Sequence, residues 1–196
     1  MFFPNHKKSY TVYTAGAGVL KQIAKPVAVV SDEIRTIAGE MFAAMRVFNG
    51  IGLAAPQYGH SLRMVVFDVP ADSNTGTSGE NALLPRMPLV VINPEIVAYS
   101  TEKNTREEGC LSVPEIYAPV ERPVCVVFRA QTLDGEFIEA ECGGLLGRCI
   151  QHELDHLDGK LFTDRLKPEV ARAVRGDLER LKKIGQSSNY RRKSKK

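Results

Sequence analysis

The sequence predicts an α+β fold, with mostly antiparallel sheets around a central helix and a further helix towards the C-terminal end. Three observations predict this class. Short runs rich in β-branched residues follow one another through short connections, as in antiparallel sheets. Other segments show the spacing of apolar residues that is typical of helices. The chain has 196 residues, of which 43% are hydrophobic, and this size suits one compact domain.

The first helix is predicted to begin after Ser31 and to end at Asn49-Gly50. Ser31 is a favourable N-cap, and two acidic residues follow it in the first turn. The apolar residues then recur at helical spacing, at Ile34, Ile37, Met41, Met45 and Phe48. Glycine after asparagine provides a common C-terminal stop.

Four strands are predicted further along the chain, and their β-branched residues are the main evidence. They cover residues 62–69, 89–97, 124–130 and 136–142. Asp134-Gly135 marks a hairpin turn between the last two strands. Residues 70–88 collect Pro, Gly, Ser, Asn and Thr, so we expect a long and mobile surface loop there.

Two more helices are predicted in the last third of the chain. The apolar positions between Leu145 and Leu157 cover most of the helix surface, so this helix should be buried and central, with Gly159 as its stop. Pro168 suits the first turn of the last helix, and Gly185 its end. The apolar stripe of that helix consists of Val170, Val174, Leu178, Leu181 and Ile184.

The charge and the cysteines bound the class of protein. The formal net charge of +3 depends on the basic run at residues 191–196, which we expect to be a solvated tail, with an RNA contact as the alternative. No apolar run approaches the length of a membrane span, and the start lacks the apolar core of a signal sequence. A soluble protein in a reducing compartment is therefore expected, with free thiols at Cys110, Cys125, Cys142 and Cys149.

The strongest local motif lies in the predicted central helix. His152 and His156 are four residues apart, so both imidazoles lie on one face and can reach one metal ion. Glu153 then lies beside the ion, where a carboxylate can take and return a proton of water. The alternative is a surface helix with scattered His and Glu, but unpaired charges would be costly in so apolar a helix. The spacing leaves the third ligand open, because no histidine follows His156 and only carboxylates are available downstream. These are Asp158, Asp164 and Glu169, while Cys110 on its own is more typical of a small buried core residue.

With three motifs in order, the chain resembles the peptide deformylase family. The motifs are GIGLAAPQ at residues 50–57, EGCLS at 108–112 and QHELDH at 151–156. The resemblance extends from about Tyr10 to about Leu166. It implies that Cys110, His152 and His156 are the metal ligands. It also implies a bacterial hydrolase of protein biosynthesis that removes the formyl group from N-terminal formyl-methionine and releases formate.

The remaining site residues follow from the resemblance together with the chemistry of these side chains. Gln57 and the backbone N–H of Leu111 are expected to stabilise developing oxyanion charge, and Glu153 to transfer the proton. The substrate should contact Gly50, Ile51, Gly52, Gly109, Leu111, Arg148 and Cys149. Arg148 either lines the methionine pocket or forms a surface salt bridge. A nicotinamide site at Gly50-x-Gly52 is not expected, because a helix precedes this segment where that motif requires a strand.

These interpretations give a division of the chain. Residues 1–9 are a short N-terminal extension, 10–166 the catalytic domain, 167–185 the C-terminal helix and 186–196 a basic disordered tail.

A Cys-His-His set accepts several divalent ions, and the resemblance favours iron(II), with zinc, nickel or cobalt as alternatives after purification. The expected partners are formylmethionyl nascent peptides and, through residues 168–196, the ribosome, with a cytoplasmic location and no membrane contact. Two rival functions stay open: a metallopeptidase, and a non-catalytic protein with a structural metal and an RNA-binding tail.

Overall fold

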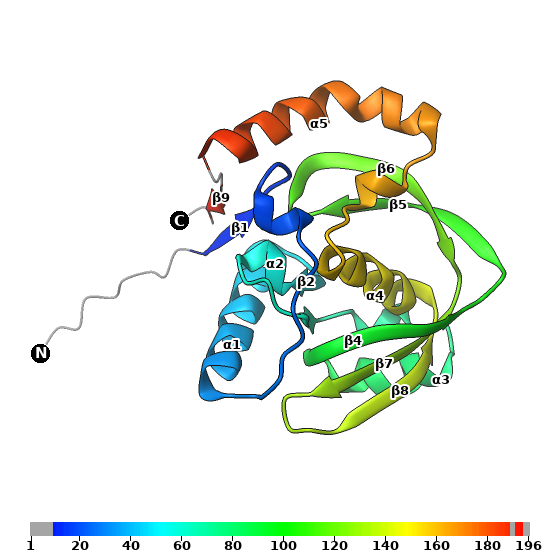
Figure 1. Cartoon of the computed structure of the whole chain (residues 1–196). Helices are drawn as coiled ribbons and strands as arrows, with labels where there is room; N and C mark the ends of the chain where they lie inside the picture. Colours follow the sequence, from blue (N-terminus) through cyan, green and yellow to red (C-terminus); the bar gives the residue numbers. More distant parts are fainter. Residues whose placement is uncertain (1–9, 189–190, 194–196) are drawn as a thin grey trace, which may run out of the picture.

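The predicted α+β class is confirmed in the computed structural model, which describes residues 10–188 and 191–193. The central element is helix α4 (Gly144–Leu157), which lies between a five-stranded sheet and a two-stranded sheet (Figure 1). Leu146, Ile150 and Leu157 on α4 are fully buried, so the helix forms part of the core that its apolar pattern predicts.

Neighbouring strands of both sheets pair in the antiparallel direction. The larger sheet has the order β2 (Gly52–Ala54), β3 (Met64–Phe67), β4 (Leu89–Tyr99), β7 (Val126–Thr132) and β8 (Phe137–Cys142). The smaller sheet consists of β5 (Lys103–Cys110) and β6 (Val113–Pro123). The four predicted strands are therefore present, as β3, β4, β7 and β8, within a few residues of the expected bounds.

Helix α1 (Asp32–Val47) begins where its cap predicts. The Ser31 hydroxyl oxygen accepts a hydrogen bond from the backbone N–H of Ile34 at 3.3 Å. The apolar face of α1, including Met41 and Met45, packs against β3 and β2. The chain then leaves the helix at Asn49 and enters β2 through Gly50 and Ile51, so this packing fixes one wall of the cavity described below.

The segment between β3 and β4 corrects the expectation of a long loop at residues 70–88. It contains the 3-10 turns η2 (Ala71–Ser73) and η3 (Leu84–Arg86) and the helix α3 (Ser78–Leu83). Thr77 and Glu80 form a capping box at the start of α3, and Leu83 and Leu84 are buried. The spacing Thr-x-x-Glu was the sequence signal for this helix, and the surrounding Gly, Ser and Pro residues obscured it.

The C-terminal part also differs from the expectation, since α5 (Pro168–Ser188) continues past Gly185. A Cβ atom at Gly185 would lie 2.2 Å from the carbonyl oxygen of Ala15, so this glycine permits close packing and does not end the helix. Within the expected disordered tail, β9 (Arg191–Lys193) pairs with β1 (Thr11–Tyr13), whose free edge supplies hydrogen-bonding partners. The rest of that tail, from residue 189 on, and the expected N-terminal extension, residues 1–9, lie outside the described residues.

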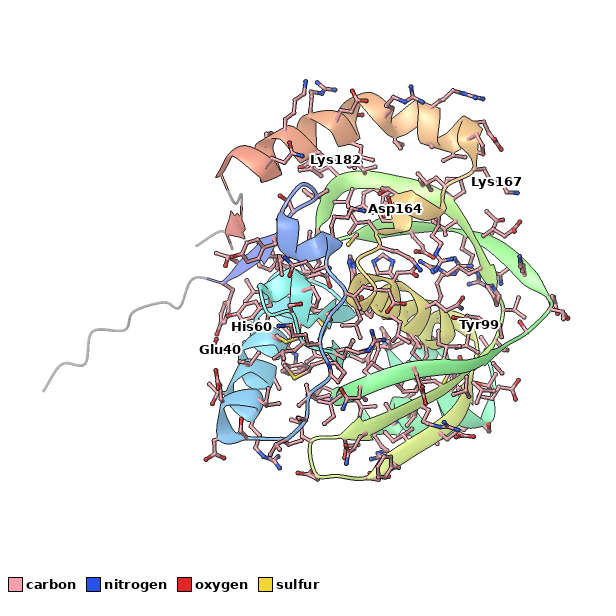
Figure 2. The ribbon with its side chains drawn as sticks, in the orientation of Figure 1. Glu40, His60, Tyr99, Asp164, Lys167 and Lys182 are labelled. Carbon is pink, nitrogen blue, oxygen red and sulfur yellow. The ribbon has the colours of Figure 1, made fainter. Side chains whose placement is uncertain are left out.

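Helix α5 packs against β6 and against Phe162 of η4 (Phe162–Arg165), and Lys182 points from it towards the body of the protein (Figure 2). Lys21 of η1 (Gly18–Lys21) forms an ion pair with Asp164 of η4 at 2.7 Å below this helix. The four cysteines are free thiols, as expected. In the described part of the chain, no helix is both long and apolar enough to cross a membrane.

Glu80 is predicted to make the stability of the fold depend on pH. Burial alone would raise the pKa of Glu80, but hydrogen bonds from Thr75 and Thr77 outweigh it and lower the pKa below 4.5. The ionised carboxylate therefore stabilises the fold above pH 4.5, and this contribution is lost as the pH falls through the lowered pKa. Glu80→Gln should lower the free energy of unfolding at pH 7 by about 1–3 kcal/mol.

Urea unfolding at neutral and acidic pH measures this effect. The difference between Glu80→Gln and the unaltered chain should shrink at acidic pH, where the carboxylate is protonated in both the folded and unfolded states. Glu179→Gln, on the exposed face of α5, is the matched control and should change little. Equal destabilisation by the two substitutions would contradict the role given to Glu80.

Candidate metal centre

Three side chains that can bind a metal ion meet between β5 and α4. Cys110 ends β5, while His152 and His156 lie one turn apart on α4. One donor atom of each residue lies within 4.8 Å of the others, and the Cys110 Sγ is 3.2 Å from the His156 Nε2. The spacing within α4 aligns the two imidazoles, and the tight turn between β5 and β6 brings the thiol to the same face.

This donor set fits a small divalent ion. Ligands placed tetrahedrally around such an ion at the usual bond lengths are about 3.5 Å apart, and the measured 3.2 Å is close to that value. The Glu108 Oε2 lies 2.9 Å from the His152 Nδ1 and fixes the ring, which leaves Nε2 for a metal. Three protein ligands leave one coordination position open, as in catalytic sites and unlike closed structural ones.

The surroundings of His152 favour positive charge at this point. Burial by itself would lower the pKa of His152, but the hydrogen bonds with Cys110 and Glu108 raise it well above 6.5. Burial, followed by the nearby His152, lowers the pKa of His156 well below 6.5, so that ring is neutral. A position that favours positive charge, next to a neutral imidazole, suits a bound cation.

Glu153 points into the same space. Its side chain is buried, at 4% exposure, and its Oε2 has no hydrogen-bonding partner among the described residues. Burial raises the pKa of Glu153 to about 7, which is the range in which a carboxylate can both take and give a proton near neutral pH. A Cβ atom at Gly52 would lie 2.6 Å from the Glu153 Oε1, so only glycine leaves room for this carboxylate.

Gln57 is held with its amide nitrogen towards the metal ligands. It lies on α2 (Ala55–Tyr58), and its Oε1 accepts a hydrogen bond from the backbone N–H of Ala54 at 2.7 Å. Its Nε2 donates to the Ser112 Oγ at 3.3 Å and approaches the Cys110 Sγ at 3.5 Å. The amide is therefore fixed before any ligand arrives, which is the preorganisation that stabilisation of an oxyanion requires.

A cavity of about 520 Å³ opens beside these groups. Its walls come from the segment after α1, from β2, from the β5–β6 hairpin and from α4. The residues expected to contact substrate all line it, namely Gly50, Ile51, Gly52, Gly109, Leu111, Arg148 and Cys149. The volume lies within the usual range for pockets that bind small ligands.

The salt-bridge alternative for Arg148 is wrong in one respect, because the ion pair that it forms is buried and not on the surface. The Arg148 Nη1 donates to the Glu108 Oε1 at 2.7 Å, and the same carboxylate accepts two hydrogen bonds from Arg122. Arg122 also pairs with Asp155 at 2.8 Å. Glu108 begins the motif EGCLS, but we predicted no role for it. Its position beside Gly109 and Cys110 is the sequence feature that could have indicated one.

The comparisons with known proteins agree with this arrangement. A family model described as Polypeptide deformylase matches residues 9–172. Peptide deformylase 2 of Gloeobacter violaceus is 46% identical over 167 residues, which are 85% of this chain and 84% of the relative. A peptide deformylase of Rhodopseudomonas palustris is 45% identical over 166 residues, 85% of this chain and 90% of the relative.

Solved structures give the same result. The class I type b peptide deformylase of Acinetobacter baumannii superposes with a TM-score of 0.71 at 36% identity, covering 80% of this chain and 98% of that one. Peptide deformylase 1B of Arabidopsis thaliana, solved with an inhibitor, gives a TM-score of 0.78 at 32% identity, with 91% and 94% covered. The similarity therefore extends well beyond the three motifs.

Cys110→Ser is expected to weaken metal binding, because a hydroxyl is a poor anionic ligand near neutral pH. Changes to groups that only orient a ligand cost about 10–100-fold in affinity, so replacement of the thiol should cost more than about 100-fold. Metal content after dialysis against a chelator measures this loss, with Cys125→Ser as the matched control. Stoichiometric metal in the Cys110→Ser protein would show that Cys110 is not a ligand.

Proposed function

This chain belongs to the peptide deformylase family, and from that premise we propose how its own residues remove the formyl group from the N-terminal formyl-methionine of nascent proteins. The activity itself follows from the family: the chain is a hydrolase that releases formate. The observation that carries the assignment of residues is the convergence of Cys110, His152 and His156 next to Glu153 at one cavity.

Cys110, His152 and His156 would hold the metal ion. A divalent ion bound there supplies a Lewis acid and lowers the pKa of water in the site. We take iron(II) to be the ion loaded in the cell, as the resemblance to the family implies. Zinc, nickel or cobalt can be held after purification, because a thiolate with two imidazoles does not select strongly among these ions. The ring of His152 is oriented for this purpose by Glu108 at 2.9 Å.

Glu153 is proposed to move the proton. Its carboxylate takes a proton from the attacking water and passes it to the nitrogen of the methionine as the C–N bond of the formamide breaks. The pKa of about 7, the burial and the free Oε2 support both halves of this role. Formate and a free amine are then the products.

Gln57 and the backbone N–H of Leu111 are proposed to stabilise the charge that develops on the formyl oxygen. The hydrogen bond from Ala54 to the Gln57 Oε1 keeps the amide nitrogen facing the site. Residues 50–52 and Gly109 line the cavity, and their backbone suits main-chain pairing with an extended peptide. Such contacts bind many sequences, because they do not depend on the later side chains of the substrate.

The methionine side chain is placed along α4, against Arg148 and Cys149. These residues precede His152 by four and three positions, so they lie one turn from it on the same side of the helix. Both line the cavity. The two rival functions are less well supported, since a structural metal site would not need Glu153, and the family comparisons favour deformylation over peptide cleavage.

The chain is proposed to work in the cytoplasm at the ribosome, where formylated chains emerge. We keep residues 10–166 as the catalytic domain and residues 168–196 as the docking part. Helix α5 supports this proposal, because it presents exposed cations on the side away from its apolar stripe. They are Arg172, Arg175, Arg180 and Lys183.

Glu153→Ala should retain the metal and lose nearly all turnover, since the carboxylate transfers protons and does not bind the ion. Loss of general acid–base catalysis typically costs 10²–10⁴-fold, so formate release should fall by at least about 10²-fold. The assay follows formate from formyl-Met-Ala-Ser, with metal content measured on the same sample. Glu102→Gln, at an exposed position, is the control; near-normal turnover in Glu153→Ala would contradict the mechanism.

Ribosome binding should depend on the exposed cations of α5 and should weaken steeply with salt, as contacts with polyanions do. A chain with Arg172, Arg175, Arg180 and Lys183 changed to Ser keeps the apolar face that packs on the body, so it is preferable to a truncation. Co-sedimentation with ribosomes at low and high salt compares the two proteins. Equal co-sedimentation of the unaltered chain and the variant at low salt would contradict the proposed ribosome docking.

A further inference from the structure

Arg148 presents one free hydrogen-bond donor to the cavity. Its side chain is only 8% exposed, and both terminal nitrogens are fully used. Nη1 donates to the Glu108 Oε1 at 2.7 Å and to the Val120 carbonyl at 3.1 Å, while Nη2 donates to the carbonyl and the side-chain oxygen of Asn104. The Nε–H has no hydrogen-bonding partner among the described residues and is not fully buried. Since Arg148 lines the cavity, we infer that this donor faces it.

The free donor lies where the first side chain of the substrate should run. With the formyl group at His152, a side chain that follows the surface of α4 meets Arg148 and Cys149 one turn earlier and Leu145 two turns earlier. This placement rests on the proposed function. The Cys149 Sγ is directed to the carbonyl oxygen of Ile51 at 3.9 Å, so its S–H is engaged. The Arg148 Nε–H is therefore the donor available to a ligand on this wall.

A methionine thioether uses such a donor poorly, because its sulfur is a weak acceptor. Oxidation gives methionine sulfoxide, whose oxygen is polar and accepts strongly. In a purely apolar pocket, this oxygen would lose its hydrogen bonds to water without replacement, and binding would suffer. Here the Nε–H replaces one of those bonds. Glu108, the nearest negative charge, is already bonded by Arg122, Arg148 and His152, which reduces its repulsion of the oxygen.

We propose that the cavity accepts chains that begin with formyl-methionine sulfoxide as well as formyl-methionine, with the Arg148 Nε–H bonded to the sulfoxide oxygen. The reaction is unchanged: water breaks the same formamide C–N bond, formate leaves, and the sulfur keeps its oxidation state. Arg148 acts as a specificity residue. Because the sulfoxide sulfur is chiral and the donor lies on one wall, the two epimers bind unequally.

The test compares formate release, as kcat/KM, from formyl-Met-Ala-Ser and from the two resolved sulfoxide epimers of the same peptide. The better epimer should lie within about tenfold of the methionine peptide, because one hydrogen bond offsets most of the desolvation. A formyl-norleucine peptide reports on the shape of the pocket without an acceptor. All assays use the metal-loaded, full-length protein.

Arg148→Lys is the informative substitution. Lysine keeps a cation that can pair with Glu108, but a methylene takes the place of the Nε–H. The ratio of kcat/KM for the better epimer to that for formyl-methionine should fall roughly three- to tenfold, and the norleucine ratio should stay the same. A merely structural effect of the substitution lowers all three rates together.

The outcomes distinguish a failure of the proposed function from a failure of the sulfoxide proposal. If the unaltered protein releases no formate from formyl-Met-Ala-Ser, the proposed function is wrong. If it hydrolyses that peptide but shows equal rates for the two epimers, or a loss of more than about 100-fold for both, the sulfoxide proposal is overturned, even where Arg148→Lys fails to fold. An unchanged sulfoxide ratio in a folded Arg148→Lys protein overturns it as well.

Discussion

The buried carboxylate of Glu108 is the group on which the arrangement of the site depends. It joins β5 to α4, because it accepts hydrogen bonds from Arg122, Arg148 and His152. Burial would raise the pKa of Glu108, but its bonds to His152 and Arg122 lower it far below 4.5, so it remains ionised. A buried charge of this kind is stable only while its partners are present, and loss of one costs about 3–5 kcal/mol.

The ion pairs around Glu108 also hold α4 in one orientation between the two sheets. Arg122 also bonds to Asp155, which lies on the same face of α4 as Arg148 and His152, and Asp155 bonds to Arg165 of η4. These ion pairs fix the rotation of α4 about its axis, and that rotation decides where the imidazoles point. The apolar residues of α4 contribute most of the free energy of packing, but burial of apolar area does not depend on direction. The charged groups fix the orientation of the helix.

Apolar periodicity was sufficient to predict α1 and α4, and β-branched composition was sufficient to predict four of the strands, so that the fold class followed from the two signals together. Both signals failed for β5, where only one residue is buried and half are charged, so that no alternation is visible. The candidate metal centre could not be predicted from such local patterns. Gln57, Cys110 and His152 are far apart in the sequence, and only the resemblance brought them together. The bonds of Arg148 depend on how β5 and β6 pack on α4, and local spacing does not contain that information.

The pairing of β1 with β9 sets Thr11 opposite Lys193, so it closes nearly the whole described chain into one loop. The entropy of closing a loop rises only with the logarithm of its length, but a strand pair of three residues offsets little of it. The close packing of Gly185 on Ala15 also holds α5 against the segment that follows β1, and so keeps β1 and β9 near each other. Because these two strands pair, a circular permutant can be joined between them, with its new termini opened in a surface turn elsewhere.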